Sequence, residues 1–320
     1  LEVDVPRTRQ SGSPVDVLGR YQRRTGDVDD AITTAYASGI STRKMSDVTE
    51  ALMGEKVSRS TVSRVTQRLE EAVEALRTTP IEGPVYYLYL DATFLDARWA
   101  RSVENVSALV AYGVGPDGHR KLLGVSVGAQ ESEATWAEIL GELIDRGLSG
   151  VRLVIADAHR GLGQAVRRLL PEAKQQRCTV HLERNVLTKA PQRLRTRLAR
   201  EVADIFRAPS REKAKERMEA LAAGLGAQVP EAMQCLEAGF AAATVFYDFP
   251  SKHWKRIRTT NSIERLHVEI KRRIRSVGAF PDRASALRLV TAVALQSTRI
   301  WSDRRYLDVS LLEEVKAQAA

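Results

Sequence analysis

Two aspartates follow apolar segments that have the composition of buried strands. Asp91 ends the segment YLYLD, and Asp157 ends the segment LVIAD. Ligands of open α/β sheets collect at the carboxyl ends of strands, where the chain changes direction. Either aspartate alone would more often cap a helix or lie in a turn, but together they predict a metal site. Mg²⁺ suits such a pair, because it binds one or two carboxylates together with phosphate oxygens.

A third carboxylate is expected from a helix that packs against those strand ends. Glu264, in TTNSIERLHVEIKRR, lies in the first turn of a predicted helix. The pattern Asn261-x-x-Glu264 is also typical of a capping box, in which the glutamate has only a structural role. The basic residues around Glu264 favour metal binding, since they would hold a DNA backbone near the same helix. If Glu264 is a cap, Glu269 is the next candidate on that helix.

Two Mg²⁺ ions held by such a trio would support an in-line attack on phosphorus. One ion activates water or a 3′-OH and the other stabilises the leaving oxygen, so no covalent nucleophile is needed. We expect these two ions as cofactors, with Mn²⁺ able to replace them. The sequence contains no P-loop, no Rossmann glycine pattern and no nucleophile-elbow serine. Nucleotide hydrolysis and acyl transfer therefore have little support.

The C-x₂-H motif at Cys178 and His181 suggests zinc, but a zinc site usually needs four ligands. The other candidates are Cys235 and histidines without paired spacing. We favour a structural or phosphate-contacting role and keep zinc as the alternative. Two cysteines cannot build a disulfide framework, so a reducing cytoplasm is the default location.

Positive charge is concentrated in two stretches of the chain. The net charge is +9, yet residues 165–217 carry 15 Lys and Arg against 6 Asp and Glu, and residues 252–275 carry 9 against 2. One such run would be a solvated helix face, but two runs flanking the candidate carboxylates favour a long polyanion, double-stranded DNA. The side chains expected to contact DNA are Arg59, Arg64, Arg177, His181, Arg184, Asn185, Trp254, Arg258, Asn261, Arg265, Lys271 and Arg272.

No apolar run approaches the roughly 20 residues that span a bilayer, and the opening LEVDVPRTRQ lacks the apolar segment of a secretory signal. We expect no membrane contact and a cytoplasmic protein that associates with the nucleoid when it binds DNA. The opening has no initiator Met, so an N-terminal part is expected to precede it.

Residues 44–69 have the pattern of a helix-turn-helix, with helices at 44–53 and 59–69 and a turn at 54–57. Ser58 can cap the second helix, whose exposed side offers Arg59 and Arg64 for DNA. A plain helical hairpin is the alternative, because helix-turn-helix patterns are common by chance.

The centre of the chain predicts a mixed α/β layer with helices on both faces of the sheet. Turn residues at 115–118 predict a hairpin, and Gly147 stands where a helix would end. Apolar runs predict strands at 85–90, 106–114, 122–127, 151–156 and 175–180, and helices at 133–146, 160–170 and 181–207.

The last part of the chain is predicted to be helical. Residues 208–250 are rich in Ala, with breakers at Pro209 and Pro230, which indicates an all-helical insertion. Another helix spans 284–300. Between them, one face of a long helix is expected to carry Ile263, Leu266, Ile270, Ile274 and Val277.

The sequence resembles the bacterial insertion-sequence DDE transposases of the Mutator superfamily. The resemblance is carried by LDATFLDAR around Asp91, GVRLVIADAHRGL around Asp157, QRCTVHLERN, and HWKRIRTTNSIERLHVEIKRR around Glu264. The segments ESEATW and RRY, the latter at 304–306, also resemble motifs of this family. These motifs follow the family's order from about residue 1 to the end, and family members usually carry further residues upstream.

The resemblance implies an RNase H-like catalytic fold whose acidic trio matches Asp91, Asp157 and Glu264. The 107 residues between Asp157 and Glu264 would hold the family's helical insertion. The resemblance also implies a homodimer that acts on terminal inverted repeats, usually by a copy-out, paste-in route. The domains expected are an N-terminal helical DNA-binding region at 1–79, a catalytic core at 80–187 and 253–320, and the insertion at 188–252.

The function expected is Mg²⁺-dependent DNA strand cleavage and strand transfer at the ends of an insertion sequence. A truncated or domesticated transposase would instead bind DNA without cutting it, although the presence of all three carboxylates argues against this. A cellular RNase H-like resolvase would have no reason to carry the Mutator-type motifs.

Overall fold

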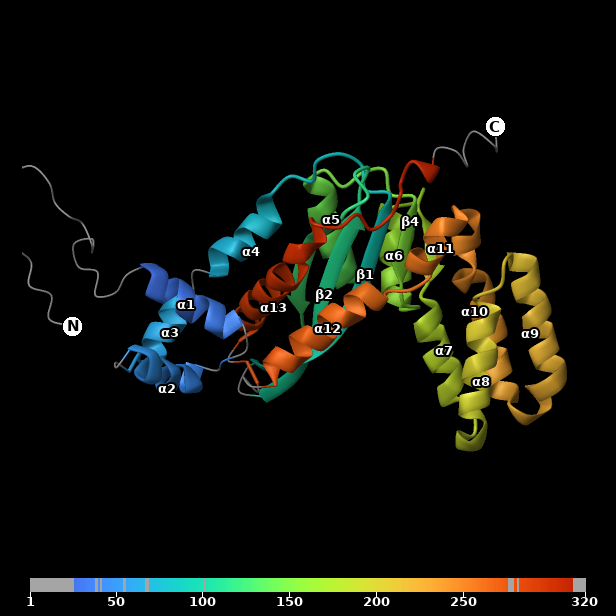
Figure 1. The fold of residues 1–320 in the computed structure, drawn as a ribbon, viewed down its shortest axis with the longest axis horizontal. Helices are drawn as coiled ribbons and strands as arrows, with labels where there is room; N and C mark the ends of the chain where they lie inside the picture. The colour runs from blue at the N-terminus through green and yellow to red at the C-terminus, as the bar shows by residue number, and fades with distance from the viewer. Residues whose placement is uncertain are drawn as a thin grey trace, which may run out of the picture.

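A five-stranded mixed sheet forms the centre of the molecule (Figure 1). The computed structural model describes residues 26–37, 40, 42–53, 56–66, 69–99, 102–275, 279–280 and 282–312. The strands are β1 (Tyr87–Trp99), β2 (Ser102–Val114), β3 (Arg120–Gly128), β4 (Leu153–Ala156) and β5 (Lys174–Arg177). Their order is β3-β2-β1-β4-β5. The first three strands are antiparallel, whereas β4 pairs parallel to β1 and β5 pairs parallel to β4.

Strand β1 is longer than the sequence predicts. The predicted strand stops at Leu90, with Asp91 at its end, but β1 continues to Trp99 and pairs with β2 along all 13 residues. Beyond Asp91 the pattern alternates, with Leu95 buried and Phe94 exposed, as in a strand with one solvated face. Asp91 therefore lies inside a strand, because the hairpin partner supplies hydrogen bonds after β4 has ended.

Helices α5 (Glu133–Asp145) and α6 (Arg160–Leu169) cover one face of the sheet. Leu88 and Leu90 pack there against Trp136 of α5 and Leu162 of α6 in one apolar cluster. The Ser132 side chain caps α5, and Gly147 follows that helix with a φ of 105°. A glycine in the left-handed region is a common way to end a helix, as predicted.

Helices α12 (Asn261–Ile274) and α13 (Arg283–Thr298) cover the opposite face. The apolar stripe predicted for α12 is confirmed where it is described, since Ile263, Leu266, Ile270 and Ile274 are all buried. Val277 lies outside the described residues. The prediction of a mixed sheet with helices on both faces is confirmed.

A second group of helices lies at the β4 end of the sheet (Figure 1). Strand β5 stops at Arg177 and not at Val180, because the Cys178 amide donates to Ala156 and the Thr179 amide to Arg258, which turns the chain into a helix. The helices are α7 (Thr179–Thr188), α8 (Gln192–Ile205), α9 (Arg211–Leu225), α10 (Pro230–Ala243) and α11 (Ser251–Ile257), with 3₁₀ turns η1 (Gly226–Gln228), η2 (Val245–Asp248) and η3 (Arg299–Trp301).

Four N-terminal helices lie at the other end of the molecule (Figure 1). They are α1 (Gly26–Ala37), α2 (Thr42–Met53), α3 (Arg59–Thr66) and α4 (Leu69–Thr78). The Ser58 hydroxyl accepts from the Thr61 amide at 3.1 Å, which is the predicted cap of α3. Helices α2 and α3 correspond to the two helices of the expected helix-turn-helix, although α3 ends at Thr66 and not at 69, and the DNA-binding motif stays a prediction. Arg64 is exposed, while the side chain of Arg59 is outside the described part.

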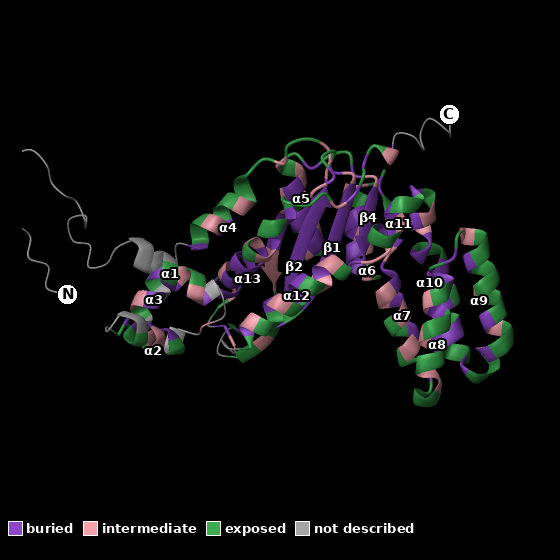
Figure 2. Ribbon diagram, in the orientation of Figure 1, coloured by how far each residue is buried: buried purple, intermediate pink, exposed green. Residues whose placement is uncertain are grey.

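The sheet is almost entirely buried, whereas α8 and α9 expose much of their surface (Figure 2). Within the described ranges, no helix is both long and apolar enough to cross a membrane.

Candidate active site

Asp91 places a carboxylate inside the protein, on the face of the sheet that α12 covers. It is 7% exposed, and its Oδ1 accepts from the Ala92 amide at 3.0 Å. The pKa of Asp91 is raised to about 7, chiefly by burial and less by the charges of Asp157 and Glu264, while His181 and the Ala92 amide act in the opposite direction. A carboxyl group that is desolvated and surrounded in this way is expected to favour a bound cation.

The register of the two parallel strands brings Asp157 beside Asp91. Tyr89 of β1 pairs with Ile155 of β4, and each aspartate lies two residues beyond that pair. Neighbouring strands are about 4.8 Å apart and side chains two residues apart share a face, so both aspartates lie on the α12 side. The Asp157 Oδ1 accepts from the Ala158 amide at 2.6 Å, which holds the carboxylate at the strand end. Asp157 is half-buried.

Glu264 reaches the same region from the first turn of α12. Its carboxylate accepts two hydrogen bonds from Arg184 of α7, at 2.6 and 3.2 Å, and lies 3.3 Å from the His181 Nε2. The capping-box interpretation of Glu264 is wrong. Asn261 is already the first helical residue, and the N-cap is Thr260, which makes no side-chain cap. The glutamate faces α7 because Arg184 offers a charged partner that the helix terminus does not.

The C-x₂-H motif joins α7 to the start of α12 and then contributes to the acidic site. The Cys178 Sγ accepts from the Thr260 amide and hydroxyl, both at 3.4 Å. Burial alone would lower the pKa of His181, but Cys178 and the charges of Asp157 and Asp91 raise it to about 9. Cys178 therefore contacts both the start of α12 and His181, and the histidine extends the motif to the two aspartates.

His267 is a site residue that the sequence reasoning missed. It is buried, with its Nδ1 3.6 Å from the Asp91 Oδ2. Burial, followed by the charges of Lys271 and His181, lowers the pKa of His267 to about 3, so the imidazole is neutral. The sequence held the clue, because a residue three positions after Glu264 lies on nearly the same side of the helix.

Three of the twelve expected DNA contacts make interior contacts instead. The Trp254 Nε1 donates to the Phe249 carbonyl at 2.6 Å, and the Arg258 guanidinium donates to the Phe206 carbonyl at 2.9 Å. The Arg177 guanidinium lies directly against Gly239 of α10. The backbone acceptors of Trp254 and Arg258 could not be read from the sequence.

Of the other described candidates, His181 faces the acidic site, and the rest have exposed side chains. Arg184 is 58% exposed even while it holds Glu264. Arg272 is bound to Glu269, whose pKa Arg272 and Arg273 lower to about 2, so Glu269 is already neutralised. The remaining exposed candidates are Arg64, Asn185, Asn261, Arg265 and Lys271.

The three carboxylates suit a hard cation in chemistry, although their present positions do not form a finished coordination shell. The Glu264 carboxylate is already paired with Arg184 and His181. Across the described ranges, no three His, Cys, Asp or Glu side chains are grouped closely enough to hold a metal ion. Carboxylate oxygens are nevertheless the ligands that Mg²⁺ prefers, and Asp91 lacks a full countercharge. Only Glu264 would have to exchange its partner.

Comparisons with known proteins agree on one family. A family model described as "Transposase, Mutator family" matches residues 1–303. The transposase for insertion sequence element ISRM5 of Rhizobium meliloti is 34% identical, over 100% of this chain and 80% of that protein. The transposase for IS1081 of Mycobacterium tuberculosis is 36% identical, over 99% of this chain and 77% of its own length. A solved Drosophila P element transposase strand transfer complex matches 93% of this chain and 86% of its own, with a TM-score of 0.37 and 11% identity, a likeness too weak to define a fold.

Proposed function

The chain belongs to the Mutator family of transposases, and on that premise we propose that it cuts and joins DNA through a metal site made by Asp91, Asp157 and Glu264. Its substrate is double-stranded DNA at the terminal inverted repeats of an insertion sequence, and its metal is Mg²⁺, which Mn²⁺ can replace. The protein acts as a homodimer in the cytoplasm, on the nucleoid.

The observation that carries this proposal is the strand register. Asp91 and Asp157 lie side by side because each follows the Tyr89–Ile155 pair by two residues, and Glu264 raises the pKa of Asp91 from a third element. Three antiparallel strands continued by two parallel ones support an RNase H-like core. Helices α8 to α10 support a helical insertion between Asp157 and Glu264.

Each side chain of the site has a separate role in this proposal. Two Mg²⁺ ions, when bound, would activate the attacking water or 3′-hydroxyl and stabilise the leaving oxygen. Asp91 and Asp157 hold their carboxylates at fixed positions on the sheet. Arg184 pairs with Glu264 and, once released from it, is available to a DNA phosphate. His267 is neutral beside Asp91, so it excludes water without competing for charge.

The test is a strand-transfer assay with a thermal melt on the same preparations. Asp91→Asn, Asp157→Asn and Glu264→Gln should each bind DNA as the wild type does. Each should lose strand transfer by more than about 100-fold, since even residues behind metal ligands cost about 10- to 100-fold. The matched control is Glu138→Gln, an exposed carboxylate on α5, across the sheet from the site.

Metal dependence is tested in parallel. Ca²⁺ should support DNA binding with little cleavage, because it tolerates looser geometry than Mg²⁺. Full cleavage in EDTA would rule the mechanism out. If Glu264→Gln keeps normal strand transfer while both aspartate variants are inactive, the third metal ligand is another residue, and Glu269 is the first candidate.

A further inference from the structure

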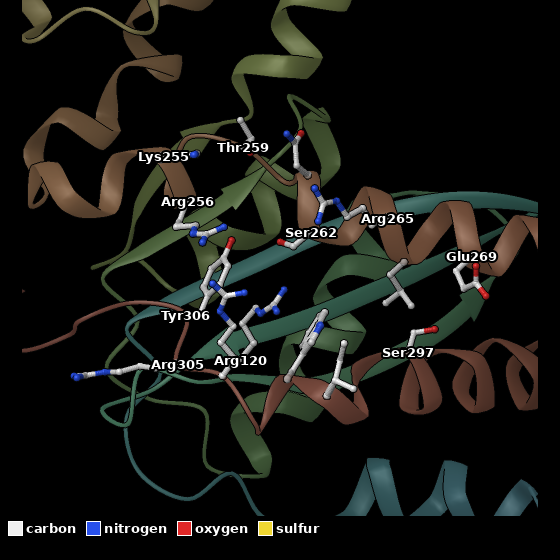
Figure 3. Close-up of a pocket in the computed structure, with 15 residues that line it drawn as sticks. Arg120, Lys255, Arg256, Thr259, Ser262, Arg265, Glu269, Ser297, Arg305 and Tyr306 are labelled. Carbon is white, nitrogen blue, oxygen red and sulfur yellow. The ribbon is translucent and has the colours of Figure 1, made fainter.

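A pocket lies beside α12, between its first turns and the segment that follows α13, and six of its fifteen lining residues are basic (Figure 3). Its volume is about 570 Å³, the size of a small-ligand site. Elements far apart in the sequence contribute to it, including β3, α11, α12 and η3. Its cationic lining residues are Arg120, Lys255, Arg256, Arg265, Arg304 and Arg305.

The positive charge of this pocket is not neutralised by the protein. Of the six cations, Arg305 pairs with Asp308 at 2.9 Å, and the other five form no ion pair with any carboxylate of the described ranges. Glu269 also lines the pocket, but Arg272 and Arg273 already hold it. Unpaired cations this close together repel one another. The pocket therefore favours an anion.

Arg120 shows the same excess of positive charge at the base of the pocket. Its guanidinium lies over the rings of Trp301 and Tyr306, at 4.3 and 4.5 Å from their centroids. Burial lowers the pKa of Arg120, and the charge of Arg256 lowers it further, against nearby tyrosines. Guanidinium groups lie over both of these rings, so the pocket offers charge and N–H donors beside its aromatic lining.

Neutral donors complete the lining. Helix α12 begins here without a side-chain cap. The Ile263 and Glu264 amides donate to the Thr260 carbonyl, which leaves the Asn261 and Ser262 amides and the positive end of the helix dipole to an anion. The Ser297 hydroxyl and the Arg120 Nε, both from lining residues, are buried without a hydrogen-bond partner. Unsatisfied buried polar atoms are uncommon, and two of the eight found in the described ranges line this pocket.

Helix α12 connects the pocket to the acidic site. At about 100° per residue, Asn261 and Arg265 lie on the outer ridge between Glu264 on one flank and Ser262 and Glu269 on the other. A strand that crosses this ridge reaches both the carboxylates and the pocket. We propose that the pocket binds the phosphodiester backbone of the DNA strand whose scissile phosphate lies at the acidic site. This rests on the proposed function in taking DNA as the substrate and the acidic site as the place where it is cut.

The experiment measures binding to duplex DNA in EDTA across a range of KCl concentrations. The pocket variant is Lys255→Gln/Arg256→Gln, which changes two exposed side chains. The control is Arg167→Gln/Arg168→Gln, which removes the same charge from exposed positions of α6, on the opposite face of the sheet. The slope of log K against log salt should fall by about 0.9 for each phosphate that the variant no longer neutralises. This fall should occur only in the pocket variant, and equally for terminal-repeat and unrelated duplexes.

A third variant separates the pocket from diffuse charge. Ser297→Phe fills the space without changing the net charge, and it should weaken DNA binding while a thermal melt confirms that it folds. The proposal would be overturned if the slope of log K against log salt were the same for the pocket variant and the control. It would also be overturned if the pocket variant lost binding to one DNA sequence only. The proposal would also be overturned by a second pair of results: dAMP or inorganic phosphate raises the melting temperature of the wild type but not of the pocket variant, while the salt dependence of DNA binding is the same in the pocket variant and the control. Because EDTA removes the metal, failure of the metal site leaves this test unaffected.

Discussion

At the scale of single residues, Asp91 shows how the fold changes the pKa of a buried carboxyl group. Burial disfavours its charged form, and the neighbouring carboxylates add to this, so the pKa rises to about 7. Such a group reduces stability at neutral pH, which proteins tolerate chiefly at functional sites.

Asp91→Asn should therefore melt higher than the wild type at pH 8 in EDTA. The folded-state pKa of about 7 is above the unfolded value of about 3.9, so folding binds a proton. Wild-type stability then falls as the pH rises from about 4 to about 7. Melts between pH 5 and pH 8 measure this, and the difference should shrink at pH 5. An equal difference at both pH values would contradict the explanation.

Arg184 competes with a metal ion for Glu264. Arg184→Gln should lower the Mg²⁺ concentration that half-saturates the thermal shift by about two- to fivefold, since an exposed pair contributes about 0.4–1 kcal/mol. Arg200→Gln, at an exposed position of α8, is the control. An unchanged or weaker Mg²⁺ response would show that the ion pair does not oppose metal binding.

At the scale of elements, the position of α12 depends on its junction with α7. Cys178 is fully buried and accepts from two groups of Thr260, which fixes the helix that carries Glu264 beside the one that carries His181 and Arg184. The motif that suggests zinc in the sequence here joins two helices.

Cys178→Ala should lower the free energy of unfolding by about 1–2 kcal/mol, because the Thr260 amide loses its acceptor. Cys178→Ser keeps an acceptor and should recover part of the loss. Chemical denaturation of the three proteins measures both. A wild-type melting temperature that falls with a zinc-selective chelator in Mg²⁺ buffer would restore the zinc alternative.

At the scale of the whole molecule, strand β1 and helix α12, which carry Asp91 and Glu264, lie between two groups of helices (Figure 1). The N-terminal helices lie beyond α13, and α7 to α10 lie beyond β4. A substrate that contacts both groups would be held across the carboxylates, which suits a long polyanion better than a small molecule.

Arg59→Ala/Arg64→Ala should weaken binding to all DNA sequences and flatten its salt dependence, if both side chains face phosphates. Filter binding to several duplexes at two salt concentrations tests this. Loss at one sequence alone would indicate base readout, and no change would leave residues 44–69 with a purely structural role.

The sequence by itself determined the features that depend on neighbours within about one helical turn or one strand. The stripe from Ile263 to Ile274, the Ser58 cap and the glycine after α5 follow from periodicity and local hydrogen bonds. The sequence also placed Asp157 correctly after a buried strand, because a short apolar run with a polar end has few alternatives.

Only the tertiary structure decided the contacts between distant residues. Glu264 pairs with Arg184, which is 80 residues away, and no local pattern distinguishes that partner from a helix cap. The position of Asp91 within β1 depends on pairing with β2, and His267 gains its role only when α12 packs on the sheet. The basic pocket beside α12 joins residues from 120 to 306. Such interactions depend on where whole elements pack, because charge and burial act through space.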